Sequence, residues 1–266
     1  MRELAGVGRF ERFGHGRRVV ILSNPQADPR WWAPPIVSAL TSAGYEAVTF
    51  VHAGPGYAPA DVARDVGTFI EHLGPEPVHL LGWSQGAAIA QEVAALRPDL
   101  VAAAALIASY GRQNTFDSLL QQAWECLDLA GPELDPVRLV LLFLTSHPAE
   151  ALGDDAFVDP LVAGMQQWST KPDGFAESRE RSREFIRQYQ ERLDVLGNIR
   201  VPCLVMGFGQ DADTFVIRAR EVAAAIPGSQ YVELANAGHL APVTEPQRVA
   251  GPILEFFAEI DIASRE

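Results

Sequence analysis

A serine lies between two glycines in the stretch VHLLGWSQG, residues 78–86. Gly82 and Gly86 flank Ser84 in a G-x-S-x-G pattern, with an apolar run before it and an alanine-rich, helix-like segment after it. A serine on a tight turn between a strand and a helix adopts a strained backbone conformation, and glycines relieve the crowding around it. The N–H groups and positive end of the following helix favour a developing negative charge. The pattern therefore predicts an exposed nucleophile at Ser84.

A serine hydroxyl becomes a good nucleophile only when a base takes its proton. Of the six histidines, His239 is the best placed, because it lies in LANAGHLAP between the last predicted strand and the last long helix. His79 lies inside the predicted strand that precedes Ser84 and cannot reach the hydroxyl. His52 ends another predicted strand and His147 lies in a turn-rich segment, so both stay open as pocket residues.

The base needs a carboxylate to orient it. Asp211 and Asp213 follow an apolar run in VPCLVMGFGQDADTF, and either of them could serve. The chain order is then serine, acid, histidine, which is the order expected for such a triad on a parallel sheet.

The elements that must position these side chains alternate along the chain. Short apolar runs rich in Val, Ile and Leu predict strands that are buried on both faces. Amphipathic segments between them predict helices, so we expect a mainly parallel sheet with helices on both faces and a ligand site at the carboxyl ends of the strands. The predicted strands are 18–23, 47–52, 78–83, 101–109, 201–207 and 230–234, and the predicted helices are 34–43, 61–73, 85–96, 215–226 and 246–260.

One region interrupts this alternation. Residues 113–198 contain four helical patterns joined by turn-rich segments and no convincing strand. We expect an all-helical cap at 113–198, inserted into a core formed by residues 1–112 and 199–266. The predicted cap helices are 116–130, 136–145, 155–168 and 175–196.

With these motifs in place, the chain resembles the α/β-hydrolase fold enzymes. The resemblance rests on LLGWSQG for the nucleophile turn, VPCLVMGFGQD for the acid and YVELANAGHLAPVTEPQRV for the histidine region. It implies Ser84 as nucleophile, His239 as base and Asp211 as the acid, with Asp213 as the alternative. It also implies that the reaction needs no cofactor and no metal.

The loop after the first predicted strand departs from the family pattern. Many members carry His-Gly there and use a backbone N–H to hold the oxyanion, whereas this chain has Ser23 and Asn24. In one register Asn24 donates its N–H together with Gln85. In the other register Pro25 takes that place and has no N–H to donate. Five tryptophans are candidates for lining the pocket, although packing in the core or the cap is the better explanation for each one taken singly. They are Trp31, Trp32, Trp83, Trp124 and Trp168.

Composition limits the classes of partner. The 266 residues are 48% hydrophobic, which suffices for one large domain. A net charge of −13 argues against nucleic acid, because a phosphate backbone needs a basic surface. The apolar runs are too short to span a membrane and the first ten residues are no signal peptide, so we expect a cytoplasmic protein with a small-molecule substrate. A homodimer stays open. We expect both cysteines, Cys126 and Cys203, to be buried rather than bridged or metal-bound.

These observations predict a serine hydrolase for an ester, thioester or lactone of a mid-sized apolar compound. One alternative keeps the triad but performs elimination, cyclisation or cofactor-free haloperoxidase chemistry. Two others are a nucleotide binder, from the G-x-G-like VMGFGQDA, and a binding module without catalysis.

Overall fold

The computed structural model describes residues 1–23, 32–167, 175–189 and 191–264, without the side chains of 165–167 and 175–179. Its centre is an eight-stranded sheet in the order β1-β2-β4-β3-β5-β6-β7-β8. The strands from β4 to β8 along this order run parallel, whereas β1 and β2 pair antiparallel at one edge. The strands are β1 Arg2–Leu4, β2 Gly8–Gly14, β3 Arg18–Leu22, β4 Glu46–His52, β5 Val78–Trp83, β6 Val101–Ile107, β7 Cys203–Phe208 and β8 Gln230–Leu234.

The six strands expected from apolar runs are present, and the antiparallel pair β1 and β2 was not predicted. Strand β2, GRFERFG, buries only Gly8 and Phe10, so it has no continuous apolar run. An antiparallel strand, such as β2 between β1 and β4, needs to be apolar on one face alone, and a run of apolar residues therefore does not reveal it. Its pairing with β4 extends the sheet away from the predicted site.

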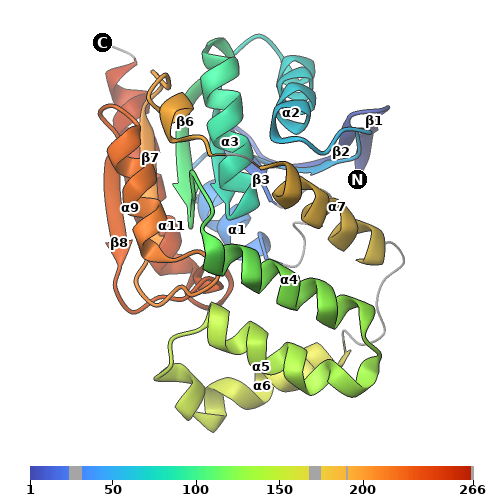
Figure 1. Ribbon diagram of the computed structural model, residues 1–266. Coiled ribbons are helices and arrows are strands. Elements are labelled where there is room, and N and C mark those ends of the chain that lie inside the picture. Colours follow the sequence, from blue (N-terminus) through green and yellow to red (C-terminus); the bar gives the residue numbers. More distant parts are fainter. Residues whose placement is uncertain (24–31, 168–174, 190, 265–266) are drawn as a thin grey trace.

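Helices cover both faces of the sheet (Figure 1). One face carries α1 and α11, whose buried residues pack with Trp32 and Trp83 in one core. The other face carries α2, α3 and α9, which form a second core with Phe69 and Val222. The helices are α1 Pro34–Ser42, α2 Pro59–Leu73, α3 Gln85–Leu96, α9 Val216–Ala225, α10 Ala241–Thr244 and α11 Pro246–Ala263.

A run of helices separates β6 from β7. In Figure 1 the arrow of β6 points toward α4, and α5 and α6 lie beyond it, so these helices cover the end of the sheet where the parallel strands finish. The helices are α4 Thr115–Leu129, α5 Asp135–Ser146, α6 Asp155–Gln167, α7 Phe175–Gln188 and α8 Leu193–Leu196, with short 3₁₀ turns between them. The division into a core and a cap domain stays a prediction.

The predicted helix 175–196 is wrong as a single element, because α7 ends at Gln188 and α8 begins at Leu193. Residues between the two helices bond to the core instead of continuing the helix. The hydroxyl of Tyr189 donates to the carbonyl of Tyr110 at 3.0 Å, and the N–H of Arg192 donates to the carbonyl of Gly111 at 2.7 Å. Arg192 also forms an ion pair with Glu92, a buried residue of α3.

Both cysteines are free, as expected, but only Cys203 is buried. Burial raises the pKa of its thiol to about 12. Cys126 is exposed, which corrects the prediction, because it lies on the outer side of the amphipathic helix α4. In the described part of the chain, no helix combines the length and apolarity needed to cross a membrane.

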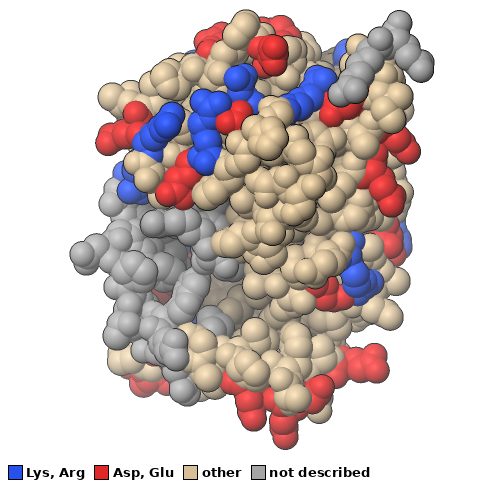
Figure 2. Space-filling model, turned by 180° about the vertical axis from the view of Figure 1, so that it is seen from behind, with Lys and Arg blue, Asp and Glu red and all other residues tan. Residues whose placement is uncertain are grey.

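Acidic side chains are prominent on the face shown in Figure 2, along its lower and right margins, and basic ones form a short band near the top. The segment Glu150–Asp159 exposes four carboxylates, those of Glu150, Asp154, Asp155 and Asp159. Acidic side chains therefore lie on the surface of the helical region between β6 and β7 as well as on the surface of the rest of the protein.

Candidate active site

Ser84 joins β5 to α3 and has φ 57° and ψ −120°, a backbone conformation that residues other than glycine rarely adopt. The two flanking glycines permit the turn. A Cβ at Gly82 would lie 2.4 Å from the backbone oxygen of Gly86, and a Cβ at Gly86 would lie 2.1 Å from the backbone oxygen of Leu22. The close approach of α3 to the end of β3 therefore explains the G-x-S-x-G pattern in steric terms.

We expect Gly86→Ala to lower the free energy of unfolding by about 3 kcal/mol or more, because the new methyl group meets backbone that cannot turn aside. Gly251→Ala is the matched control, since Gly251 also lies in a helix and a Cβ there meets nothing within 4 Å. This control should be neutral or slightly stabilising. Urea unfolding of both variants measures the difference, and equal midpoints would contradict the steric explanation.

Asp211 and His239 form a buried hydrogen-bonded pair beyond β7 and β8. Nδ1 of His239 lies 2.8 Å from Oδ2 of Asp211. The other carboxylate oxygen, Oδ1, accepts the backbone N–H groups of Asp213 at 2.9 Å and Thr214 at 2.7 Å. These two donors fix the carboxylate, and the carboxylate in turn fixes the imidazole. The structure thus gives Asp211, rather than Asp213, the contact with Nδ1.

Asp213 contacts the other side of the same ring. Its Oδ2 lies 3.3 Å from Nε2 of His239. No hydrogen bond of the described residues joins Ser84 to His239, although Ser84 and Asp213 line the same pocket. The sequence indicates Asp213 only as an alternative to Asp211, because nothing in a linear sequence shows that one imidazole faces two carboxylates.

The two carboxylates determine the electrostatics of His239. Burial by itself would lower the pKa of the imidazole, but the charges of Asp211 and Asp213 outweigh it and raise the pKa from 6.5 to about 9. Burial raises the pKa of Asp211, and the nearby His239 opposes that shift. The ring is therefore mostly protonated at neutral pH.

Gln85 is the first residue of α3, so its backbone N–H has no acceptor within the helix and is available to an oxyanion. Its buried side chain accepts a hydrogen bond from the hydroxyl of Ser182 on α7 at 2.9 Å. The predicted second donor, Asn24, and its alternative Pro25 lie outside the described residues, as do Trp31 and Trp168.

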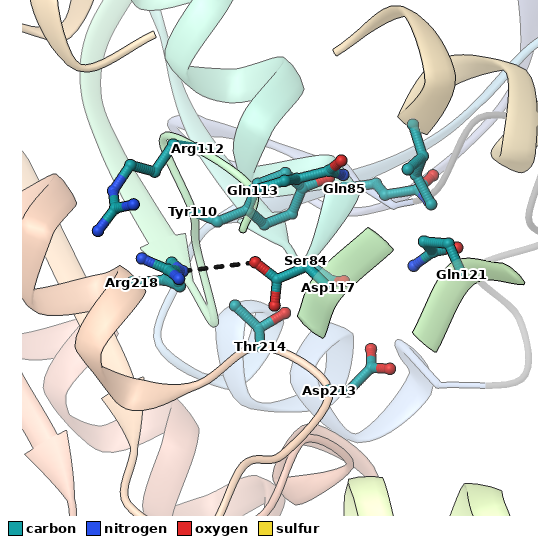
Figure 3. A pocket seen from close by; sticks show the side chains of 11 residues that line it. Ser84, Gln85, Tyr110, Arg112, Gln113, Asp117, Gln121, Asp213, Thr214 and Arg218 are labelled. Carbon is teal, nitrogen blue, oxygen red and sulfur yellow. Dashed lines mark ion pairs between the residues drawn. The ribbon is translucent and has the colours of Figure 1, made fainter. Parts of the chain in front are cut away.

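A pocket opens beside Ser84 between α3, α4 and α9 (Figure 3). Most of its described lining residues have polar side chains, and none of the described tryptophans lines it. Trp32 and Trp83 instead pack together in the core at 4.9 Å between ring centroids, and Trp83 donates from its indole N–H to the carbonyl of His239 at 3.2 Å. The lining comprises Ser84, Gln85, Tyr110, Arg112, Gln113, Asp117, Gln121, Ile186, Asp213, Thr214 and Arg218.

Charged residues that the sequence did not single out form one side of this pocket. Asp117 on α4 forms an ion pair with Nε of Arg218 on α9 at 3.6 Å, drawn dashed in Figure 3. Arg218 also pairs with Glu221 at 2.9 Å, and Glu221 binds Arg112. Only the topology brings α4 and α9 together, so no spacing in the sequence predicts this cluster.

The two histidines left open by the sequence do not line the described pocket. His52 is buried and lies 2.7 Å from Asp65 through Nε2, which ties the end of β4 to α2. His147 is buried between the rings of Phe143 and Phe157 at the end of α5. No group of His, Cys, Asp or Glu in the described residues is arranged to hold a metal ion.

Comparisons with known proteins agree with this architecture. A model of the alpha/beta hydrolase family matches residues 13–251. A protein of Mycobacterium tuberculosis, provisionally named non-heme bromoperoxidase BpoC, is 31% identical over 94% of this chain and 97% of its own length. The crystal structure of that protein matches with a TM-score of 0.83 at 30% identity, covering 95% of this chain and 96% of the other. The chain belongs to the alpha/beta hydrolase family, which confirms the predicted fold class.

More distant relatives differ in their names. A Pseudomonas savastanoi protein provisionally named carbamate hydrolase RutD is 24% identical over 90% of this chain and 92% of its own length. The enol-lactonase of Burkholderia xenovorans has a TM-score of 0.74 at 19% identity, over 94% of this chain and 96% of that one, and so shares the fold. Members of the family are named for more than one kind of reaction, so the reaction of this chain has to be argued from its own site.

Proposed function

We propose that this protein is a serine hydrolase that cleaves an ester, thioester or lactone with Ser84, His239 and Asp211. The observation that carries the proposal is the placement of these residues at the carboxyl ends of β5, β8 and β7, with His239 and Asp211 hydrogen bonded at 2.8 Å. A strained serine between two closely packed glycines supports the same assignment.

In this mechanism Ser84 Oγ attacks the acyl carbon while Nε2 of neutral His239 takes the hydroxyl proton. The ring then gives that proton to the leaving group. Asp211 holds Nδ1 protonated and steadies the imidazolium that forms. Water attacks the acyl-enzyme in a second round, with His239 again as base, and releases the acid product. The N–H of Gln85 supports the oxyanion, with Asn24 as the proposed second donor.

The polar lining changes the expectation for the substrate. We expected an apolar compound, but Gln113, Gln121 and Thr214 offer hydrogen-bonding groups beside Ser84. Burying these groups against a purely apolar ligand would leave them unpaired, which is unfavourable. We therefore favour a substrate with polar groups close to the scissile bond.

Fluorophosphonate labelling tests this proposal. We expect covalent modification of one serine, identified as Ser84 by mass spectrometry of the labelled peptide, and faster labelling at pH 9 than at pH 7. A panel of p-nitrophenyl esters, lactones and acyl thioesters then identifies the substrate class, since hydrolysis adds water to the product. Failure of Ser84 to label at either pH would argue against a serine nucleophile.

A second candidate is haloperoxidase-like chemistry, favoured by the name of the 31% identical relative from Mycobacterium tuberculosis. In that case the protein would brominate a phenolic dye when supplied with bromide and hydrogen peroxide. Loss of bromination in Ser84→Ala would place the reaction at the same site, and bromination without any ester hydrolysis would favour this candidate over the first.

A further inference from the structure

The imidazole of His239 has a carboxylate at each ring nitrogen. Asp211 lies 2.8 Å from Nδ1, and Asp213 lies 3.3 Å from Nε2. Each ring nitrogen carries either one in-plane proton or one lone pair, so Nε2 bonds to one partner at a time. The contact with Asp213 and the proton transfer from Ser84 therefore compete for the same atom.

The two contacts also affect which protons the ring holds. The contact at Nδ1 is a hydrogen bond, whereas Asp213 lies at ion-pair distance from Nε2. Two negative charges this close to the ring favour its positively charged form, which has an N–H at each nitrogen. That form is the imidazolium, which cannot act as a base. The charges of Asp211 and Asp213 favour this form against the effect of burial, and the pKa of His239 rises to about 9.

Other groups near the ring do not change the preference of His239 for its protonated form. Trp83 contributes an uncharged indole, which donates to the backbone of His239. His147, at the end of α5, has its pKa lowered by burial and is uncharged at neutral pH. Farther round the pocket, Asp117 and Arg218 offset one another as an ion pair at 3.6 Å. The two aspartates in the loop after β7 are thus the charges that act on His239.

We propose, on the basis of the function proposed above, that Asp213 is a positioning residue that keeps His239 in a resting, doubly protonated state and yields Nε2 to Ser84 when the ring loses a proton. The exchange follows from charge. A lone pair on Nε2 repels the oxygen of Asp213 and accepts the hydroxyl of Ser84. Asp213 can then turn toward water, because its side chain is 30% exposed while that of Asp211 is fully buried.

Asp213→Asn tests the inference through the pH dependence of labelling. In the unmodified protein the rate of fluorophosphonate inactivation should rise with a midpoint near the pKa of His239, about 9. Removing one close negative charge should move that midpoint down by about one to two pH units. At pH 7 the variant should label about three- to tenfold faster, since more of the ring is neutral although each neutral ring is a weaker base. An unchanged midpoint, or a large loss of labelling at every pH, would overturn the inference.

An NMR titration of the His239 imidazole gives a readout that needs no activity. We expect the same downward shift in Asp213→Asn, and no shift in Asp194→Asn, which removes an exposed carboxylate from α8. If the NMR shift appears but Ser84 never labels, the effect of Asp213 on the protonation of His239 stands and the proposed hydrolase function fails. If Ser84 labels but the NMR pKa does not move, the hydrolase function stands and Asp213 has no such role.

Thermal stability adds an independent check. Because the pKa of His239 is raised in the folded protein, its ion pairing stabilises the fold fully below pH 6.5, and this contribution disappears as the pH rises through about 9. The stability difference between the unmodified protein and Asp213→Asn should therefore be largest at pH 6 and should shrink above pH 9. A difference that does not depend on pH would show that Asp213 acts on the fold by some other contact.

Discussion

Ser84→Ala is expected to lower kcat/KM for the best ester substrate by about 10⁶-fold. The alanine retains the turn between β5 and α3 but has no oxygen to attack the acyl carbon. The strained conformation, φ 57°, is already unfavourable for serine and is equally so for alanine, so stability should change little. Steady-state kinetics at pH 9, near the raised pKa of His239, measures the loss.

The matched control for this variant is Ser118→Ala. Ser118 is exposed on α4, and its hydroxyl donates to the carbonyl of Asn114 at 3.1 Å. Its activity should equal that of the unmodified protein. If Ser84→Ala keeps more than about a tenth of the activity while it folds normally, the nucleophile is another group and the proposed mechanism is wrong.

Asp211→Asn is expected to lower kcat by about 10⁴-fold, the effect of giving the catalytic histidine the wrong tautomer. The backbone N–H groups of Asp213 and Thr214 donate to the Oδ1 position, so they will hold the amide oxygen of the new asparagine there. The amide NH₂ must then face Nδ1 of His239 and donate to it. Nε2 consequently carries the proton, and it cannot accept another from Ser84.

Comparison with Asp213→Asn separates the two aspartates in one experiment. The variant at 213 should remain active with a pH profile shifted to lower pH, whereas the variant at 211 should lose activity at every pH. The opposite result would make Asp213 the acid of the triad. Far-UV circular dichroism of both variants would show whether a loss of activity comes from unfolding.

Patterns formed by residues close together in the sequence were sufficient to predict much of the fold. Continuous apolar runs predicted the buried strands such as β5 and β7, because parallel strands covered on both faces need apolar residues throughout. Strand β2 was not predicted, because it buries residues on one face only. The break between α7 and α8 was not predicted either, because it is produced by hydrogen bonds from Tyr189 and Arg192 to the distant backbone of Tyr110 and Gly111.

The sequence by itself determined the family and the types of residue available for chemistry. The order of Ser84, Asp211 and His239 along alternating strands and helices leaves the carboxyl edge of a parallel sheet as their common location. Steric contacts also require glycine at 82 and 86. A Cβ at 82 would meet the backbone of Gly86 a few residues farther along the chain, and a Cβ at 86 would meet the backbone of Leu22 on the adjacent strand β3.

Only the tertiary structure decided how these residues meet. It assigned Nδ1 of His239 to Asp211 and Nε2 to Asp213, and it placed Arg218 and Asp117 beside Ser84 from separate helices. The physical reason is that hydrogen bonds and ion pairs depend on distances of a few ångströms between side chains, and those distances follow from the packing of whole elements. A sequence pattern predicts which helices and strands form, but it does not predict the distances between their side chains in the folded protein.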